Sequence, residues 1–262
     1  MPRLFSIFRV YHTGEREGID MRFRRILLKL SGEVLSCSNG FGFDFDAVRR
    51  IGEEIVEVAQ SGIQIAMVVG GGNMLRGRDL EKLGVERAQA DYMGMLATVM
   101  NALCLQDVLE KFGAPTRVQT AIEMRQMAEP YIRRRALRHL EKGRIVIFAA
   151  GTGSPYFSTD TAAALRAAEM EADCLLKATK VDGIYNADPK KHPEAVLLHR
   201  LTYMDALRQQ FEVMDAAAFS LCMENAIPII VLNILKKGNM KNFLLKGTDT
   251  GTIVSAQEDG GA

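Results

Sequence analysis

Tryptophan is absent from this chain of 262 residues, and cysteine and histidine are scarce, with four of each. The cysteines, Cys37, Cys104, Cys174 and Cys222, are far apart and form no CxxC pair. Neither they nor the scattered histidines have the close spacing of metal ligands, so no protein-bound metal is predicted. Reduced thiols in a cytoplasmic protein are the simplest interpretation of this cysteine usage.

An excess of one charge is also missing, since 33 lysines and arginines stand against 32 aspartates and glutamates, for a net charge of +1. Such a balance gives no sign of binding to nucleic acid or to a membrane surface. No apolar run approaches the roughly 18 residues of a membrane span. We therefore expect neither kind of partner.

The two ends of the chain differ from the rest in composition. Residues 1–20 lack a long apolar run and a small-residue cleavage site, so they make a poor signal peptide. Met21 stands immediately before the first apolar strand, so either it is the functional start or residues 1–20 are a loosely ordered extension. The tail, residues 257–262, is predicted to be disordered. Between these ends there are no repeats or linkers, so residues 21–256 are predicted to form one compact domain.

From residue 21 onward, short apolar runs alternate with helical periods. The apolar runs predict strands at residues 24–30, 63–69, 116–120, 144–150, 173–178 and 228–233. Apolar residues at intervals of three and four predict a helix between the first two strands, built on Val48, Ile51, Ile55 and Val58, with Asp44 or Asp46 as its N-cap. Further helices are predicted at residues 91–112, 131–142, 159–172 and 203–226. This alternation predicts an α/β fold, with a mostly parallel open sheet covered by helices on both faces.

Glycine-bearing turns follow three of the predicted strands. Ser31-Gly32 follows the first strand, GGGN (70–73) the second, and GTGSP (151–155) the strand at 144–150. Ligands of open parallel sheets bind beyond the carboxyl ends of the strands, where glycine lets backbone N–H groups approach phosphate oxygens. A single turn of this kind is equally well explained by a change of chain direction. Three of them favour a phosphate site, but the P-loop, GxGxxG and protein-kinase motifs are absent.

A lysine interrupts the first strand. Lys29 stands among Ile26, Leu27, Leu28 and Leu30, directly before the first glycine turn. A fixed positive charge at this place indicates a phosphate ligand. The alternative is a lysine whose stem follows the strand edge while its amine reaches water.

Six motifs resemble those of the bacterial uridylate (UMP) kinases of the amino acid kinase superfamily. They are, in chain order, ILLKLSGE, VVGGGNMLRG, ADYMGMLATVMNAL, AAGTGSPYFSTDTAA, LLKATKVDGIYNADP and VMDAAAF, and the resemblance covers residues 22–255. The lysine-then-glycine strand end and the triple glycine are similar across the superfamily. The MGMLATVMN helix and the GTGSPYFSTD loop are similar to the uridylate kinase branch in particular. The resemblance implies that residues 21–256 form an amino acid kinase-like catalytic domain with a three-layer fold.

The resemblance also implies a reaction, in which the γ-phosphoryl group of ATP, bound with Mg²⁺, is transferred to UMP in pyrimidine nucleotide biosynthesis. The residue chemistry agrees with it. A phosphate monoester has a second pKa of about 6, so UMP is mostly a dianion at neutral pH and needs no general base. The motifs accordingly contain no histidine. Cations and positioning are what such a transfer requires.

By match to the family motifs, Lys29 would reach the β- and γ-phosphates of ATP, and Arg76 would clamp phosphate oxygens with its planar guanidinium. The segment 179–188 resembles the pocket for adenine and ribose. The ATP-binding residues implied in this way are Lys29, Leu30, Ser31, Gly32, Gly72, Arg76, Thr179, Tyr185 and Asp188.

In the same way, Asp91 would bind the ribose hydroxyls of UMP, although it could instead cap its helix. The loop at 152–159 resembles the loop for the base and phosphate of UMP, with an apolar wall from Tyr156 and Phe157. Ser154 and Ser158 stand where asparagine and threonine are common in the family. The UMP-binding residues implied are Gly71, Asp91, Thr152, Gly153, Ser154, Pro155, Tyr156, Phe157, Ser158 and Thr159.

The catalytic residues implied are Lys29, Asp160 and Asp215. Asp160 resembles the acid that orients the catalytic cations, and Asp215 resembles its companion. We assign both an organising role rather than base catalysis, while either could instead cap a helix. Lys177 would supply a second cation or be an exposed lysine at a strand end.

Regulation is implied by the resemblance alone. The loop CSNGFGFD (37–44) resembles the family's loop linked to activation by GTP, and family members are typically homohexamers inhibited by UTP. The allosteric residues implied are Cys37, Ser38, Asn39, Gly40, Phe41 and Gly42.

Two other functions stay open. A nucleotide- or oxoanion-binding or storage module of the same fold, without turnover, would keep the glycines but lose Lys29, Asp160 and Asp215. A kinase for an acyl or carbamoyl acceptor would lack the GTGSPYFST pattern and the helix of Asp91.

Overall fold

The computed structural model of the chain describes residues 23–75, 80, 82–189, 191–209, 211, 214–248 and 250–256. The predicted extension at 1–20 and the predicted tail at 257–262 lie outside these residues, and so does Arg76.

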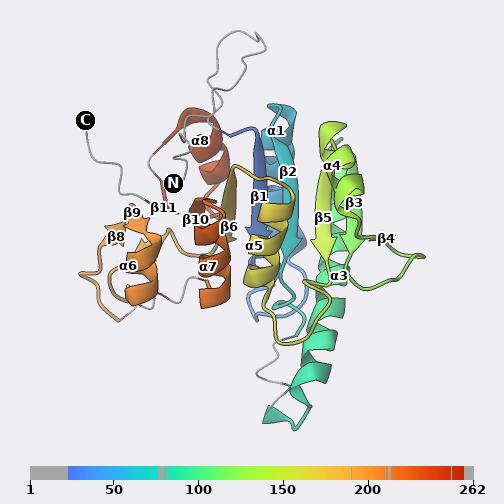
Figure 1. Ribbon diagram of the computed structural model, residues 1–262, viewed down its shortest axis with the longest axis horizontal. Coiled ribbons are helices and arrows are strands. Elements are labelled where there is room, and N and C mark those ends of the chain that lie inside the picture. Colours follow the sequence, from blue (N-terminus) through green and yellow to red (C-terminus); the bar gives the residue numbers. More distant parts are fainter. Residues whose placement is uncertain are drawn as a thin grey trace, which may run out of the picture.

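In the described part of the chain, nine strands form one sheet in the order β4-β3-β5-β2-β1-β6-β10-β11-β9 (Figure 1). Within this sheet all neighbours are parallel except β10 and β11, so the predicted mostly parallel sheet is confirmed. The strands are β1 (Arg25–Leu30), β2 (Gln64–Val69), β3 (Thr116–Thr120), β4 (Glu129–Pro130), β5 (Ile145–Ala149), β6 (Cys174–Thr179), β9 (Arg200–Thr202), β10 (Ile229–Asn233) and β11 (Thr252–Ser255). A separate antiparallel pair consists of β7 (Ile184–Tyr185) and β8 (Leu197–Leu198).

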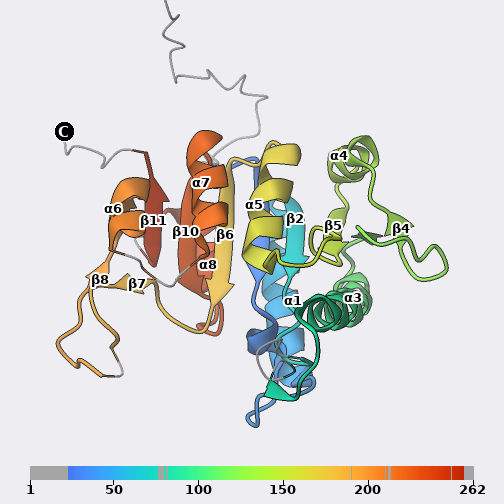
Figure 2. The same ribbon diagram turned by 60° about the horizontal axis from the view of Figure 1, so that its bottom comes forward.

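Helices cover both faces of the sheet, as predicted (Figure 2). One face carries α1 (Phe45–Gln60), α3 (Arg87–Lys111) and α8 (Asn239–Lys246). The other carries α4 (Arg133–Glu141), α5 (Thr159–Glu169), α6 (Tyr203–Arg208) and α7 (Ala216–Glu224). A short 3₁₀ helix, Gly32–Leu35, follows β1 directly.

Successive residues of β1 face opposite layers, because strand side chains alternate. Ile26, Leu28 and Leu30 pack in the core with α1, α3 and α8, whereas Leu27 packs in the core with α5 and α7. Lys29 shares the face of Leu27 and is only 7% exposed. The alternative in which Lys29 runs out to water along a strand edge is therefore wrong.

The first predicted helix is confirmed as α1. Its four predicted apolar residues are buried. Of the two candidate N-caps, Asp44 is the one that accepts a hydrogen bond from the backbone N–H of Ala47, at 3.0 Å.

The single helix predicted at residues 203–226 is wrong, because the segment forms α6 and α7 with a break between them. Asp215 has an extended backbone and accepts a hydrogen bond from the N–H of Ala218 at 2.8 Å, which begins a new helix. The apolar residues continue across the break, so the helical period does not reveal it.

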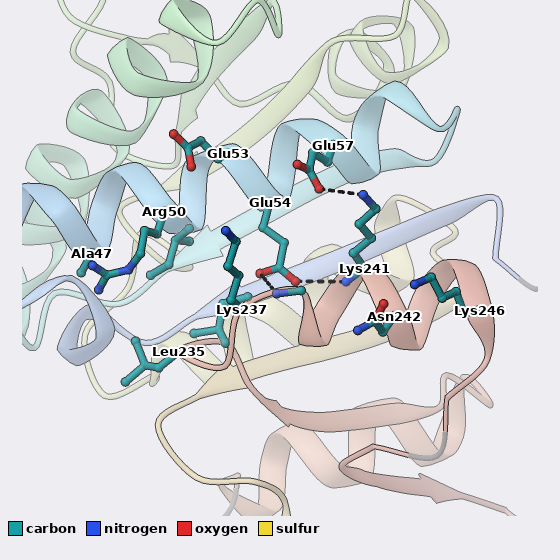
Figure 3. Close-up of a pocket in the computed structure, with 13 residues that line it drawn as sticks. Ala47, Arg50, Glu53, Glu54, Glu57, Leu235, Lys237, Lys241, Asn242 and Lys246 are labelled. Atoms are coloured by element: carbon teal, nitrogen blue, oxygen red, sulfur yellow. Dashed lines mark hydrogen bonds and ion pairs between the residues drawn. The ribbon is translucent and has the colours of Figure 1, made fainter.

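Helix α8 has no counterpart among the predicted elements, because its N-terminus is capped from another helix. Its N-cap residue, Gly238, has no side chain, and Glu54 of α1 accepts hydrogen bonds from the N–H groups of Gly238 (3.2 Å) and Lys241 (3.0 Å). Figure 3 shows this carboxylate in a pocket of about 480 Å³ between the two helices. Burial raises the pKa of Glu54, although the N–H groups of α8 oppose that change.

Helix α3 is, by length and composition, the one described helix that could cross a membrane, with a mean hydropathy of 1.2 over its most apolar 18 residues. Of that window, 44% is buried within the protein. Helices at the core of a protein have the same composition, and α3 packs against α1, β3 and β5.

Two of the three glycine turns touch each other. A Cβ on Gly32 would lie 2.6 Å from the carbonyl oxygen of Gly70 and 2.6 Å from the nitrogen of Gly72. None of these three glycines has a positive φ, so a left-handed backbone is not the reason for glycine at these positions. Glycine is required at position 32 because two backbones meet there.

We expect Gly32→Ala to lower the free energy of unfolding by about 1–3 kcal/mol, because the added carbon would force the two turns apart. Gly72→Ala is the matched control, since its Cβ would meet only the Cγ of Glu33, at 3.5 Å. Denaturant unfolding of both variants measures the difference. Equal stabilities would contradict the close approach of the two turns.

Candidate active site

Two buried lysines lie side by side on neighbouring strands. Lys29 of β1 is in register with Lys177 of β6, and their exposed fractions are 7% and 9%. Both strands carry the residues LLK, at 27–29 and 175–177, and a hydroxyl residue follows two positions after each lysine (Ser31 and Thr179). The alternative in which Lys177 is an exposed lysine at a strand end is therefore wrong.

Asp160, near the start of α5, lies between these lysines. One carboxylate oxygen is 2.7 Å from Nζ of Lys29, and the other is 2.8 Å from Nζ of Lys177. Ser158 is the N-cap of α5, so the alternative in which Asp160 caps a helix is wrong. We call Lys29, Asp160 and Lys177 the charged triad.

The pKa values of Asp160 and Lys177 are both lowered within the charged triad. Burial raises the pKa of Asp160, but the charges and hydrogen bonds of Lys29 and Lys177 outweigh burial and hold this pKa below its ordinary value. Burial and the charge of Lys29 lower the pKa of Lys177, against the opposing effect of Asp160. An ionised carboxylate with a lowered pKa is a weak base, so Asp160 suits the holding of cations better than the removal of a proton.

Asp215 caps α7, as one of its two interpretations predicted. Its carboxylate also accepts hydrogen bonds from the hydroxyls of Ser158 and, at 3.0 Å, Thr161. Asp215 thereby joins the N-termini of α5 and α7. The hydroxyl of Ser158, one of the expected UMP contacts, is used within this junction.

A pocket of about 140 Å³ lies between α3, the glycine turn after β2 and the loop after β5. We call it the acceptor pocket, and we call residues 150–158 the acceptor loop. The expected UMP-binding residues that line the pocket are Gly71, Asp91, Thr152, Phe157 and Thr159. The other expected residues of this set, Gly153, Ser154, Pro155, Tyr156 and Ser158, belong to the acceptor loop but do not line the pocket.

Asp91 lies in the second turn of α3, which begins at Arg87. It is therefore not the N-cap, and that alternative is wrong. Its carboxylate accepts a hydrogen bond from the N–H of Tyr156 at 2.7 Å and lies 3.1 Å from Nε of Arg87. Asp91 thus joins α3 to the acceptor loop.

The expected ATP-binding residues fall into two groups. Lys29, Leu30, Ser31, Gly32 and Gly72 gather at the carboxyl ends of β1 and β2. Thr179 is the last residue of β6, Tyr185 is the last residue of β7, and Asp188 follows β7. Their assignment to ATP rests on the resemblance.

Asn73 and Asn101, which were not predicted as site residues, connect three parts of the site. The side chain of Asn73 donates to the carbonyl of Gly42 (3.1 Å) and to Oδ1 of Asn101 (3.0 Å). Asn101 donates to the carbonyl of Gly70 (2.6 Å). The loop at 37–42 is therefore tied to the glycine turn after β2. In the sequence, only the position of Asn73 at the end of the GGGN turn pointed to this connection.

Among the described residues, no group of three or more histidine, cysteine or acidic side chains is arranged to hold a metal ion. The carboxylates of this site already have partners. Asp91 accepts a hydrogen bond from Tyr156 and pairs with Arg87, Asp160 pairs with two lysines, and Asp215 accepts hydrogen bonds from hydroxyls and from a helix N-terminus.

We expect Asp160→Asn to lower the free energy of unfolding by about 3–5 kcal/mol, because two buried ammonium groups lose their counter-charge. Lys177→Met should leave the melting temperature unchanged or raise it, because it removes a buried charge and keeps the Lys29–Asp160 pair. Thermal unfolding of both variants tests this. A stable Asp160→Asn variant would contradict the account of the charged triad.

The stability of the fold should also depend on pH, because Asp160 takes up a proton in acid. Its pKa is lowered on folding, so the unfolded chain binds this proton more tightly, and the stabilisation present above the ordinary value of 3.8 is lost as the pH falls through the folded-state pKa. As the pH is lowered from about 7 to about 3, the melting temperature of the wild-type protein should therefore fall more steeply than that of Asp160→Asn.

The model of the amino acid kinase family matches residues 24–233. The structure of UMP kinase from Bacillus anthracis is similar with a TM-score of 0.87 and 38% identity, covering 90% of this chain and 97% of that one. UMP kinase from Ureaplasma parvum gives a TM-score of 0.84 and 38% identity, covering 90% and 100% of the two chains. Uridylate kinase from Archaeoglobus fulgidus gives 0.68 and 29%, covering 88% and 99%. The chain belongs to the amino acid kinase family.

Proposed function

We propose that this protein is a UMP kinase, which transfers the γ-phosphoryl group of Mg-ATP to UMP and forms ADP and UDP for pyrimidine nucleotide biosynthesis. One observation carries the proposal, namely that the acceptor pocket adjoins the charged triad. Thr159 lines the pocket, and its neighbour Asp160 holds both lysines. The 38% identity to a UMP kinase over 90% of the chain supports the choice of acceptor.

The acceptor needs no base. UMP arrives as a dianion, because the second pKa of its phosphate is about 6. The work of the protein is to bring this dianion to the γ-phosphate of ATP and to balance the negative charge that both carry. Gly71, which packs closely against α3, lines the pocket on the side proposed for the phosphate. Asp91 and Phe157 offer a carboxylate and an aromatic wall to the nucleoside.

Lys29 and Lys177 supply the balancing charge. Lys29 stabilises the β- and γ-phosphates of ATP from the end of β1, and Lys177 reaches the transferring group from the adjacent strand. Asp160 keeps the two ammonium groups together, which would otherwise repel each other. Arg76, outside the described residues, is proposed to clamp the same phosphates. Mg²⁺ enters with ATP and neutralises its phosphate oxygens.

Asp215 has an indirect role in this account. By capping α7 and holding Ser158, it fixes the start of α5 and therefore the place of Asp160. The segment with Thr179, Tyr185 and Asp188 is proposed to hold the adenosine of ATP. Residues 21–256 would act as one catalytic domain in the cytoplasm, where the four free cysteines stay reduced.

We expect the purified protein to release ADP from Mg-ATP with UMP much faster than with dUMP, CMP, AMP or carbamate. Lys29→Ala should lower kcat with UMP about a hundredfold or more, because a preorganised positive charge is removed from the transferring group. Lys142→Ala, which changes an exposed lysine after α4, is the matched control and should keep full activity.

Other outcomes of this assay identify the alternatives. Turnover with carbamate rather than UMP would indicate an acyl or carbamoyl kinase. Tight binding of ATP without turnover on any acceptor would indicate a binding or storage module, and either result would refute the proposed function.

We also propose that the protein is a homohexamer and that an apolar stripe on α3 makes one of its contacts. Tyr92, Met93, Leu96 and Met100 are 42%, 37%, 52% and 53% exposed, and their spacing places them on one face of the helix. Exposed apolar side chains gathered in this way are typical of a protein interface. A second copy that presents the same stripe would cover it through a two-fold contact.

The double variant Leu96→Glu/Met100→Glu should reduce the mass of the assembly, because like charges would face each other across the two-fold contact. Light scattering after size exclusion measures this mass. Met204→Glu, at an exposed methionine of α6, is the control and should keep the wild-type mass. An unchanged mass of the double variant would rule out this interface.

Effectors complete the proposal. GTP as activator and UTP as inhibitor follow the family pattern, with Cys37–Gly42 as the proposed responsive loop. Its two hydrogen bonds with Asn73 (2.8 and 3.1 Å) would carry a change in this loop to the glycine turn.

A further inference from the structure

Two residues of the acceptor loop have a left-handed backbone without being glycine. They are Ala150, with φ 61°, and Tyr156, with φ 72°. A residue with a Cβ adopts this conformation only where its surroundings impose it. Something therefore holds the acceptor loop near both of its ends.

Helix α3 provides a hydrogen-bond acceptor for each of these two residues. The N–H of Ala150 donates to Oγ1 of Thr98 at 2.8 Å, and the N–H of Tyr156 donates to Oδ2 of Asp91 at 2.7 Å. Asp91 and Thr98 stand two helical turns apart, so they lie on the same face of α3. Both also line the acceptor pocket.

We propose that Thr98 is a positioning residue for UMP, and that Thr98 and Asp91 together hold the acceptor loop in the conformation that receives UMP. This inference rests on the proposed function and adds to it a residue that never needs to touch the substrate. Thr98 is 2% exposed and Ala150 is fully buried, so no water competes for this hydrogen bond. The hydroxyl of Thr98 donates its own hydrogen to the carbonyl of Met95, at 2.7 Å, which leaves its oxygen directed at Ala150.

Loss of the hydrogen bond between Thr98 and Ala150 would displace the residues that follow Ala150. Gly151 and Thr152 come next in the chain and line the acceptor pocket. Without the oxygen of Thr98, the buried N–H of Ala150 lacks an acceptor and its backbone relaxes away from the left-handed conformation. Thr152 then moves relative to Asp91. The hydroxyl of Thr98 bonds to Met95 and Ala150, and neither is an expected ATP contact, so we expect binding of ATP to be unaffected.

Kinetics with three variants test the proposal. Thr98→Val, which keeps the shape and removes the oxygen, should raise KM for UMP about tenfold and leave KM for ATP within twofold of wild type. Thr98→Ser, which keeps the hydroxyl, should restore KM for UMP. Thr116→Val is the matched control, because Thr116 is fully buried and its hydroxyl donates to the carbonyl of Ala114 at the far end of the sheet. It should lower the melting temperature while leaving both KM values unchanged.

Hydrogen exchange of the ligand-free protein supplies a readout that does not depend on turnover. Thr98→Val should speed the exchange of amides 150–157, whereas Thr98→Ser and Thr116→Val should not. If the wild-type protein fails to phosphorylate UMP, the proposed function fails while exchange still reports on the loop. Unchanged exchange, or a KM for UMP within twofold of wild type in Thr98→Val, would overturn the proposal.

Discussion

A carboxylate shared by two buried lysines is the interaction on which the site depends. Lys29 and Lys177 are neighbours because β1 and β6 pair in register, and two ammonium groups this close are tolerable only with an anion between them. Asp160 supplies that anion from a helix on one face of the sheet. The start of α5 must therefore lie where Asp160 can reach both lysines. This position depends on the conformation of the acceptor loop and on the N-caps of α5 and α7.

Helix α3 is the second organising element, because it contacts every loop of the acceptor pocket. Its side chains hold the glycine turn through Asn101, and the acceptor loop through Thr98 and Asp91. Its exposed face carries the apolar stripe proposed to contact a second copy. Assembly and substrate binding would thus share one rigid helix, which connects the oligomeric state to the geometry of the acceptor pocket.

The central strands could be predicted from the sequence because strands buried on both faces are continuously apolar, and glycine turns mark where they end. The break between α6 and α7 could not, since it depends on Asp215 capping a helix within an unbroken apolar period. Helix α8 depends on Glu54 from another helix. The motifs predicted that Lys29 and Asp160 belong to one site, and the structure places the two side chains in contact. The position of Lys177 beside Lys29 follows from the register of β1 and β6, which the motifs do not contain. No local pattern distinguishes Thr98 from an ordinary buried threonine, since its partner, Ala150, is distant in sequence and lies directly after β5.

The most direct test of the account is a crystal structure with ADP, UMP, Mg²⁺ and an aluminium fluoride mimic of the transferring phosphoryl group. The account predicts UMP in the acceptor pocket against Asp91 and Phe157, ADP along the segment 179–188, and the mimic between them within hydrogen-bond distance of Lys29 and Lys177. A mimic bound away from the two lysines, or UMP outside the acceptor pocket, would contradict the central claim.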